Sequence, residues 1–264
     1  MSDPCRSECM PLTLSVAIIT KNEEANLART LESVRWADET VIVDCGSTDR
    51  TEEIARSFGA KFFVENWKGF GVQKNSAISK CSGDWILALD ADEEVSPELA
   101  DEIRLLLADS PSQEAYFLPR RNFFLGRWIR HGGYYPDPKL RLFRRGAARF
   151  EERAVHETIR TTGPAGHLRG DLLHHAYPTL DAYIEHMNRY SSLGAAQAVA
   201  RGKTSRNTLS FWWNVFLVPV ATFKYNYFFR LGFLDGREGF LQHLYHSAYV
   251  SWKYAKAWER ARRP

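Results

Sequence analysis

The stretch Trp85-Ile86-Leu87-Ala88-Leu89-Asp90-Ala91-Asp92 carries the strongest indication of the fold. Five apolar residues run without interruption into two carboxylates that stand two positions apart. A continuous apolar run of this length is typical of a parallel strand that is covered on both faces. In open α/β sheets, ligands bind beyond the carboxyl ends of such strands. The stretch therefore predicts a buried strand over residues 85–89 that leads into a polar site.

Further short apolar runs alternate with stretches of helical spacing. Strands are predicted over residues 14–20, 41–43, 62–64 and 85–89. Helices are predicted over residues 24–35, from a cap at Ser47 or Thr48 to Gly59, from the turn at 69–71 to Ala77, and from Ser96 onward. Strands and helices that alternate with short connections form a right-handed, mostly parallel sheet. The predicted fold class is α/β, with helices flanking the sheet.

Polar segments follow three of these strands, at Thr20–Glu23, Asp44–Ser47 and Asp90–Asp92. All three are expected at one edge of the sheet. Two carboxylates at positions i and i+2 past a buried strand converge on one hard cation and are costly to place there without one. The segment 90–92 therefore predicts a divalent cation site, for Mg or Mn, because an oxygen-only ligand set fits both ions. Lys21 and Glu23 are expected to form a loop ion pair.

Four segments in chain order carry a resemblance to a known family. They are Thr20-Lys21-Asn22-Glu23-Glu24, Val43-Asp44-Cys45-Gly46-Ser47-Thr48-Asp49, Gln73-Lys74-Asn75-x-Ala77, and Asp84-Trp85-Ile86-Leu87-x-Leu89-Asp90-Ala91-Asp92-Glu93. Their order and their placement at strand ends resemble the motifs of the family 2 glycosyltransferases. The resemblance implies a GT-A fold, a Rossmann-like sheet that binds a nucleotide sugar, and inversion at the anomeric carbon. A metal ion suits this chemistry because it neutralises the diphosphate leaving group.

The resemblance also implies which side chains hold the donor. The implied donor-binding residues are Thr20, Asn22, Glu23, Asp44, Lys74, Asp90 and Arg141. Thr20 and Asn22 would line the nucleotide pocket, and Asp44 would accept a hydrogen bond from the base. Lys74 would lie near the diphosphate, and Asp90 would contact the ribose or a metal-bound water. For Asp44 an Asx turn before the following glycine is an alternative role, and the two roles are compatible.

The implied metal ligands are Asp92, which would bind directly, Asp90, and His156, which would support the metal or the leaving phosphate. A later stretch, Tyr135–Arg145 with Val155–Glu157, resembles the branch that contains bacterial lipopolysaccharide-core glucosyltransferases. Arginines in this stretch are expected either to hold phosphate oxygens or to be solvated on one strand face. They are Arg141, Arg144 and Arg145.

Inversion requires a general base that takes the proton of the acceptor hydroxyl. Glu157 is the first candidate, on the motif resemblance, and Asp137 is its rival. An ordinary salt bridge between His156 and Glu157 at a strand end is the alternative interpretation of that pair.

The chain is predicted to have four regions: a leader at 1–11, a nucleotide-sugar-binding half at 12–110, an acceptor-side half at 111–178, and a helical region at 179–264. The last region is unusually aromatic between Phe211 and Tyr254. Polar residues and a proline interrupt the run 211–229, so it is a poor membrane-spanning helix. Two interpretations remain open: helices that lie in a membrane interface, or a helical cap that packs on the catalytic domain.

Composition limits the possible partners. The net charge of +3 is too small to indicate nucleic-acid binding. Ten basic residues between Arg120 and Arg153 face only three acidic ones, which suits a diphosphate, a polyanionic substrate or an anionic lipid surface. No charged segment followed by an apolar stretch marks a secretory signal, and Cys45 and Cys81 are expected to be buried thiols. The expected location is cytoplasmic, peripheral on the cytosolic face of the inner membrane.

The sequence therefore predicts a glycosyltransferase that moves a hexose, glucose from UDP-glucose, onto a glycolipid such as the lipopolysaccharide core. The same chemistry with ADP-heptose, another hexose donor or a polyprenyl-phosphate acceptor is the nearest alternative. A non-catalytic, membrane-associated carbohydrate-binding protein is the second. A dinucleotide-dependent oxidoreductase is excluded, because Lys21–Glu24 stands where that class needs a Gly-x-Gly-x-x-Gly turn.

Overall fold

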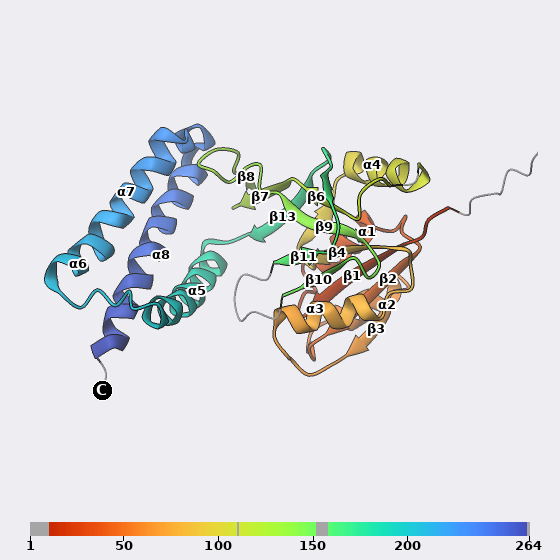
Figure 1. The fold of residues 1–264 in the computed structure, drawn as a ribbon, viewed down its shortest axis with the longest axis horizontal. Helices are drawn as coiled ribbons and strands as arrows, with labels where there is room; N and C mark the ends of the chain where they lie inside the picture. Colours follow the sequence, from red (N-terminus) through yellow and green to blue (C-terminus); the bar gives the residue numbers. More distant parts are fainter. Residues whose placement is uncertain (1–10, 110, 152–157, 263–264) are drawn as a thin grey trace, which may run out of the picture. The chain divides into compact units, whose positions relative to one another are not determined.

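The computed structural model describes residues 11–109, 111–151 and 158–262 (Figure 1). The chain divides into two compact units. The first takes in the chain up to Pro119 together with Pro138–Leu172, and the second takes in Arg120–Asp137 and the chain from Leu173 onward. Residues 111–178 were predicted to form one acceptor-side half, whereas Arg120–Asp137 belong to the same compact unit as the C-terminal helices.

The first unit is built on a seven-stranded sheet in the order β12-β6-β9-β4-β1-β2-β3. Its strands are β1 (Leu14–Thr20), β2 (Glu39–Asp44), β3 (Lys61–Val64), β4 (Trp85–Asp90), β6 (Ala115–Leu118), β9 (Lys139–Arg144) and β12 (Ala165–His167). β1 pairs in parallel with β2 and β4, β2 with β3, and β12 with β6, while β9 runs antiparallel to its neighbours β4 and β6. The predicted α/β class with a mostly parallel sheet is confirmed.

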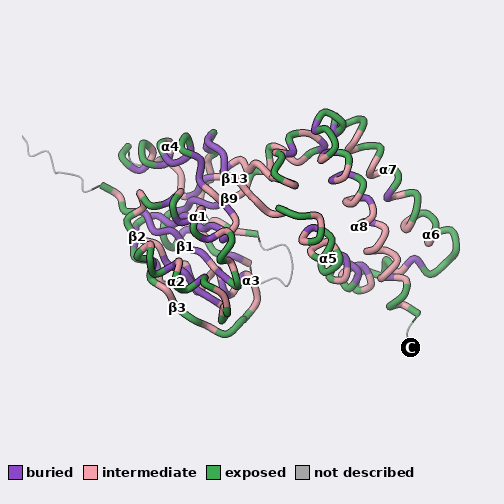
Figure 2. Tube along the Cα trace, turned by 180° about the vertical axis from the view of Figure 1, so that it is seen from behind, coloured by how far each residue is buried: buried purple, intermediate pink, exposed green. Residues whose placement is uncertain are grey.

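Side chains of β4 alternate between two apolar clusters. Trp85, Leu87 and Leu89 belong to a cluster on one face, with residues of α1 (Leu27–Ser33), α2 (Thr51–Ser57) and α4 (Pro97–Ala108). Ile86 and Ala88 belong to the other face, where α3 (Phe70–Ser79), β10 (Ala148–Phe150) and β11 (Ile159–Thr161) pack. Both faces of the sheet are therefore covered, as the continuous apolar run requires. Figure 2 shows the strands as the most deeply buried part of this unit.

Two helices begin later than predicted. The first begins at Leu27, after a turn in which the Asn26 and Leu27 amides donate to the Glu23 carbonyl, and Asn22 before this turn adopts a left-handed backbone (φ 55°). The second begins at Thr51, because the Ser47 hydroxyl bonds to Asp44 and to the Asn22 amide instead of capping a helix. Ser96 caps α4 as predicted, accepting from the Leu99 amide at 3.2 Å.

The second unit joins a small sheet to a set of helices. Its strands are β7 (Arg120–Phe124), β8 (Arg127–Trp128) and β13 (Leu172–Tyr177), with β7 between the other two. Its main helices are α5 (Leu180–Ala200), α6 (Thr208–Trp212), α7 (Val218–Lys224) and α8 (Gly236–Arg262), and α5 packs along α8. Two π-helical stretches, η1 (Trp213–Leu217) and η2 (Tyr225–Phe229), and a 3₁₀ turn, η3 (Gly232–Asp235), complete it.

The segment 208–229 is one continuous helical rod with two π-helical stretches. Pro219 lies near the start of α7, directly after η1. Proline lacks an amide donor, so a wider turn beside it relieves the lost hydrogen bond. Among the described helices none is long and apolar enough to span a bilayer.

Candidate active site

The three polar segments predicted at strand ends meet at one edge of the sheet. β1 lies between β2 and β4, and all three run parallel. Thr20 is in register with Asp44, and Ile19 is in register with Asp90. The carboxyl ends of these strands therefore present Thr20, Asp44 and Asp90 side by side, where α/β proteins bind their ligands.

Asp44 organises the loop that follows β2. It is 1% exposed, and its Oδ1 accepts from the Gly46 and Ser47 amides, both at 2.7 Å. Its Oδ2 accepts from the Thr20 hydroxyl at 2.8 Å and from the Ser47 hydroxyl at 2.5 Å. Gly46 has φ 81°, a left-handed conformation that glycine adopts without strain. The Asx-turn role of Asp44 is confirmed, and its contact with a nucleotide base stays a prediction.

The loop after β1 is fastened to the loop after β2. The Asn22 amide donates to the Ser47 hydroxyl at 2.7 Å, and Asn22 Oδ1 accepts from the Thr48 amide at 2.8 Å. Lys21 donates to the carbonyls of Cys45 and Gly46. The predicted ion pair of Lys21 with Glu23 is therefore wrong, because the Lys21 ammonium donates to backbone carbonyls of the facing loop.

Cys81 is buried as predicted, but Cys45 in the same loop as Gly46 is only half-buried. Burial, and then the nearby Asp44 carboxylate, raises the pKa of the Cys45 thiol. This thiol is therefore held in its neutral form at neutral pH.

Glu23 lies half-buried among aspartates. Its Oε2 accepts from the Asn26 side-chain amide at 3.0 Å. Burial raises the pKa of the Glu23 carboxyl, and the negative charges of Asp92, Asp49 and Asp90 add to the rise. Glu23 and the two aspartates of the metal prediction thus share one electronegative region.

Asp90 is held between two cations. Lys74, on α3, places Nζ 2.6 Å from Asp90 Oδ1, and Arg141, on β9, places a terminal guanidinium nitrogen 2.5 Å from Oδ2. Burial alone would raise the pKa of Asp90, but Arg141 and then Lys74 keep it well below its usual range. Asp90 is therefore an anion at neutral pH. The predicted position of Lys74 near the donor diphosphate stays a prediction, and in this structure Lys74 contacts Asp90.

Glu93, the residue at the start of β5 (Glu93–Val95), also belongs to the site, although it was not predicted as a site residue. Glu93 is fully buried; its Oε1 accepts from Arg141 at 2.8 Å and its Oε2 accepts from the Asp90 amide at 3.0 Å. The expectation of a solvated Arg141 is wrong, because its side chain is 7% exposed and the two carboxylates enclose it. An acidic residue directly after Asp92 in a strand-ending segment was the available signal.

Asp92 is half-exposed on the turn that follows β4. Among the residues with described positions, no three His, Cys, Asp or Glu side chains are arranged to hold a metal ion. Mg is commonly held by one or two carboxylates together with substrate phosphates. Asp92, with Asp90 beside it, fits such a site, and His156 lies outside the described residues.

Of the two candidate bases, only Asp137 lies among the described residues. Glu157 lies outside the described residues, as does its neighbour His156. Asp137 belongs to the second unit, where its Oδ2 accepts from Arg120 at 2.7 Å and from the Asn122 side chain at 3.3 Å. Asn122 Oδ1 in turn lies 2.7 Å from Nδ1 of His174. Asp137 is thus part of a polar network within its own unit.

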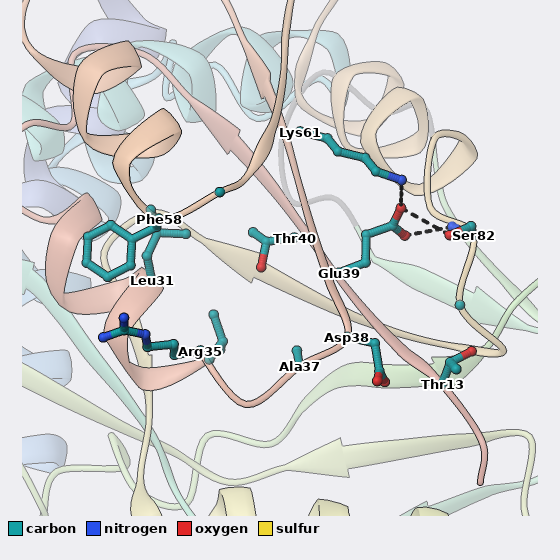
Figure 3. A pocket seen from close by; sticks show the side chains of 13 residues that line it. Thr13, Leu31, Arg35, Ala37, Asp38, Glu39, Thr40, Phe58, Lys61 and Ser82 are labelled. Atoms are coloured by element: carbon teal, nitrogen blue, oxygen red, sulfur yellow. Dashed lines mark hydrogen bonds and ion pairs between the residues drawn. The ribbon is translucent and has the colours of Figure 1, made fainter.

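A cavity of about 330 Å³ lies at the opposite end of the parallel strands (Figure 3). Its lining includes residues that precede or begin strands, among them Thr13, Glu39 and Lys61, together with Leu31 of α1 and Phe58 at the end of α2. Glu39 accepts from Lys61 at 2.5 Å, from the Ser82 amide at 2.7 Å and from the Ser15 hydroxyl. Burial opposes its ionisation, but these bonds lower the pKa of Glu39 to about 2. All these partners tie strand beginnings together, so the network is structural.

The family of this chain follows from its similarity to known proteins. The sequence profile of Glycosyl transferase family 2 matches residues 15–169. The chain belongs to glycosyl transferase family 2, and the predicted enzyme class, a glycosyltransferase, is confirmed. The matched span contains all the residues that were predicted to bind the donor.

Similar proteins include other glycosyltransferases. Lipopolysaccharide core biosynthesis glycosyltransferase LpsC of Rhizobium meliloti (strain 1021) is 35% identical over 94% of this chain and 93% of its own length. The uncharacterized glycosyltransferase RT0209 of Rickettsia typhi (strain ATCC VR-144 / Wilmington) is 33% identical over 86% of this chain and 80% of its own. Among solved structures, S. aureus TarS 1-349 in complex with UDP has a TM-score of 0.48 and 16% identity, over 95% of this chain and 91% of that one.

Proposed function

We propose that this glycosyltransferase moves a hexose, glucose from UDP-glucose, onto a lipopolysaccharide-core or related glycolipid acceptor with inversion of the anomeric carbon. The observation that carries the proposal is the edge of the sheet where Lys74, Asp90 and Asp92 meet the Asp44 loop. The similarity to LpsC, which extends over nearly the whole of both chains, supports the choice of a lipopolysaccharide-core acceptor.

In this proposal the two strand-end loops bind the nucleotide. The Thr20–Asp44–Ser47 hydrogen bonds hold the loops rigid, so that base and ribose meet a preformed surface. Lys74, whose side chain is 12% exposed, is the cation within reach of the donor diphosphate. Its ammonium group neutralises charge that grows on the leaving diphosphate, which is how preorganised cations lower such barriers.

Asp92 is the proposed direct ligand of Mg or Mn, and Asp90 is the proposed contact to the ribose or to a metal-bound water. When bound, the metal supplies Lewis-acid stabilisation of the diphosphate leaving group. Glu23 and Asp92 add negative charge that attracts a cation to this edge.

Transfer itself is proposed to be a single displacement. The base takes the proton of the acceptor hydroxyl, whose oxygen attacks the anomeric carbon on the face opposite the diphosphate. The new glycosidic bond forms as the bond to the diphosphate breaks, and the nucleoside diphosphate leaves. Glu157 is the proposed base and Asp137 the alternative.

Peripheral contact with an anionic membrane is proposed for the second unit, because a glycolipid acceptor is membrane-bound. The rod 208–229 contains no acidic residue, and many of its apolar side chains are exposed. They are Leu209, Trp212, Trp213, Phe216, Leu217, Val220, Tyr225, Phe228 and Phe229. Basic residues flank the rod at Arg201, Lys203, Arg206 and Arg230, and Lys224 lies within it. Aromatic side chains beside basic ones favour the interface of an anionic bilayer.

Flotation on anionic liposomes tests the membrane contact. Replacing Trp212, Trp213 and Phe216 together by Ser removes three exposed side chains and is expected to weaken binding by about 2 kcal/mol, more than tenfold. The control replaces Trp67 and Leu105, exposed apolar residues of the first unit, by Ser and should float like wild type. Equal flotation of the triple variant and wild type would show that the rod is not the anchor.

A panel of nucleotide sugars tests the enzymatic proposal. The protein is heated with Mn or Mg and each donor, and slow release of nucleoside diphosphate is followed in parallel. A bound ligand raises the melting temperature by mass action, so a donor registers even without acceptor. We expect a metal-dependent response to a UDP-sugar. A response only to an ADP-sugar would overturn the donor, and no response from folded protein would favour a non-catalytic carbohydrate-binding protein.

A further inference from the structure

Asp90, Glu93 and Arg141 contact one another around the start of the turn after β4. A terminal guanidinium nitrogen of Arg141 donates to Asp90 Oδ2 at 2.5 Å and to Glu93 Oε1 at 2.8 Å. The remaining oxygen of Glu93 accepts from the Asp90 amide at 3.0 Å. Arg141 thus holds the Asp90 side chain, and Glu93 holds both Arg141 and the Asp90 backbone. The Thr30 hydroxyl fixes the next residue by donating to the Ala91 carbonyl at 2.7 Å.

Burial distinguishes Arg141 from the other arginines of this stretch. Its side chain is 7% exposed, and Glu93 beside it is fully buried. Arg144, in the same strand, is 51% exposed and approaches Glu114 only to 3.6 Å. Binding a phosphate needs a guanidinium edge that a ligand can reach, and in Arg141 a terminal nitrogen is already shared by two carboxylates.

The charges of Asp90 and Glu93 explain why Lys74 lies beside Arg141 as a second cation. Asp90 and Glu93 carry two negative charges, and Arg141 and Lys74 carry two positive ones. Lys74 contacts the outer oxygen of Asp90 and lies 5.1 Å from the centre of the Phe150 ring. If Lys74 turns toward a diphosphate, Arg141 remains with Asp90, so this carboxylate is never buried without a partner.

We propose that Arg141 is a positioning residue, which orients Asp90 and the turn that carries Asp92 and does not itself bind the donor phosphates. The inference rests on the proposed function, because it assigns these aspartates to the donor and its metal. It replaces the donor-binding role predicted for Arg141 from the sequence. Lys74 is then the cation of the pair that serves the diphosphate.

The test compares UDP binding with and without metal in the variant Arg141→Lys. A positioning role predicts unchanged UDP affinity in EDTA, within about twofold, and a rise of about tenfold or more in the Mn concentration that half-saturates the UDP-bound protein. Loss of residues that orient metal ligands typically costs 10- to 100-fold in metal affinity. A phosphate-binding role predicts the reverse, weaker UDP binding in EDTA with an unchanged Mn requirement, and would overturn the proposal.

The variant Glu93→Gln provides a second test, because the positioning role and the phosphate-binding role predict different changes in UDP affinity and in the Mn requirement. It weakens the hold on Arg141 and on the Asp90 amide, so a positioning role again predicts a raised Mn requirement and unaltered UDP binding in EDTA. If Arg141 bound phosphate, releasing it from Glu93 would tighten UDP binding in EDTA. This variant decides the question if Arg141→Lys does not fold, as judged by thermal melting.

Arg144→Lys, an exposed change in the same strand, serves as control and should leave both affinities at the wild-type values. UDP binding by the wild-type protein distinguishes a failure of the proposed function from a failure of the inference about Arg141. If it binds no nucleoside diphosphate with or without Mn, the proposed function fails and the inference fails with it. If it binds UDP with Mn but the variants follow the phosphate-binding pattern, only the inference about Arg141 fails.

Discussion

Replacing Lys74 by Met removes the cation that the account assigns to the donor diphosphate while keeping a chain of similar length. In the free protein Lys74 contacts Asp90 at 2.6 Å, and Arg141 contacts the other oxygen of the same carboxylate. Loss of Lys74 therefore leaves Asp90 with one counter-ion, and the 28% exposure of its side chain allows water to take the vacated place. The fold is expected to survive the change.

The magnitude follows from the contacts that are gained and lost. A hydrogen bond to a charged group contributes about 1.5–3 kcal/mol. This range corresponds to about 10- to 150-fold in affinity. Lys74 gives up its contact with Asp90 when it turns to the diphosphate, so the lower half of the range is expected for UDP binding. A larger effect is expected on kcat/KM, because charge on the diphosphate is greatest as the sugar departs.

Calorimetric titration with UDP in the presence of Mn measures the first quantity, and release of UDP from the donor measures the second. Lys80→Met is the matched control, because Lys80 ends the same helix and bonds to Glu65. It should leave both quantities near wild type. The reasoning is refuted if Lys74→Met binds UDP and turns over as wild type does while its melting temperature is unchanged.

Three further predictions concern single carboxyl groups. Asp92→Asn should abolish metal-dependent turnover with the fold intact, and wild-type turnover measured with Mn would contradict the metal assignment. Glu157→Gln should keep donor binding and lose transfer; near-normal transfer would move the base to Asp137 or elsewhere. Glu39 has a pKa lowered to about 2, so its ionic bonds stabilise the fold above about pH 4.5 and lose this effect as the pH falls toward 2. The shift sets a ceiling of about 3 kcal/mol, and the 57% exposure of Lys61 reduces the expected cost of Glu39→Gln at pH 7 to about 1–2 kcal/mol. Urea unfolding should show this cost at pH 7 and a smaller one at pH 3, whereas equal costs at both would refute the ionic origin.

Much of the fold followed from local patterns. The apolar runs at 14–20 and 85–89 are strands because continuous apolar segments need cover on both faces, and such segments are recognisable without a partner. Their ends then placed Thr20, Asp44 and Asp90 on one edge, since parallel strands share a direction. The resemblance to the family added the roles of those residues.

What escaped prediction depends on contacts between distant segments. Arg141 lies 51 positions from Asp90, and only the pairing of β9 with β4 brings the two together. Side chains alternate between the two faces of a strand, but this alternation does not indicate which face is covered and which is solvated. The sequence therefore allowed two roles for Arg141, binding of phosphate oxygens or exposure to solvent. Likewise serine is a favoured helix N-cap residue, but the Ser47 hydroxyl donates to Asp44 and accepts from the Asn22 amide instead of capping a helix.

One assay measures whether this protein transfers a hexose from a UDP-sugar to a membrane glycolipid with inversion. The protein is incubated with radiolabelled UDP-glucose, Mn and purified lipopolysaccharide truncated in the core, and the anomeric configuration of the product is then determined. We expect label in the lipopolysaccharide fraction, joined in the β configuration from the α-linked donor, and loss of that label in Asp92→Asn. Label transferred with retention, or UDP released from every donor without any glycolipid product, would rule out the proposed function.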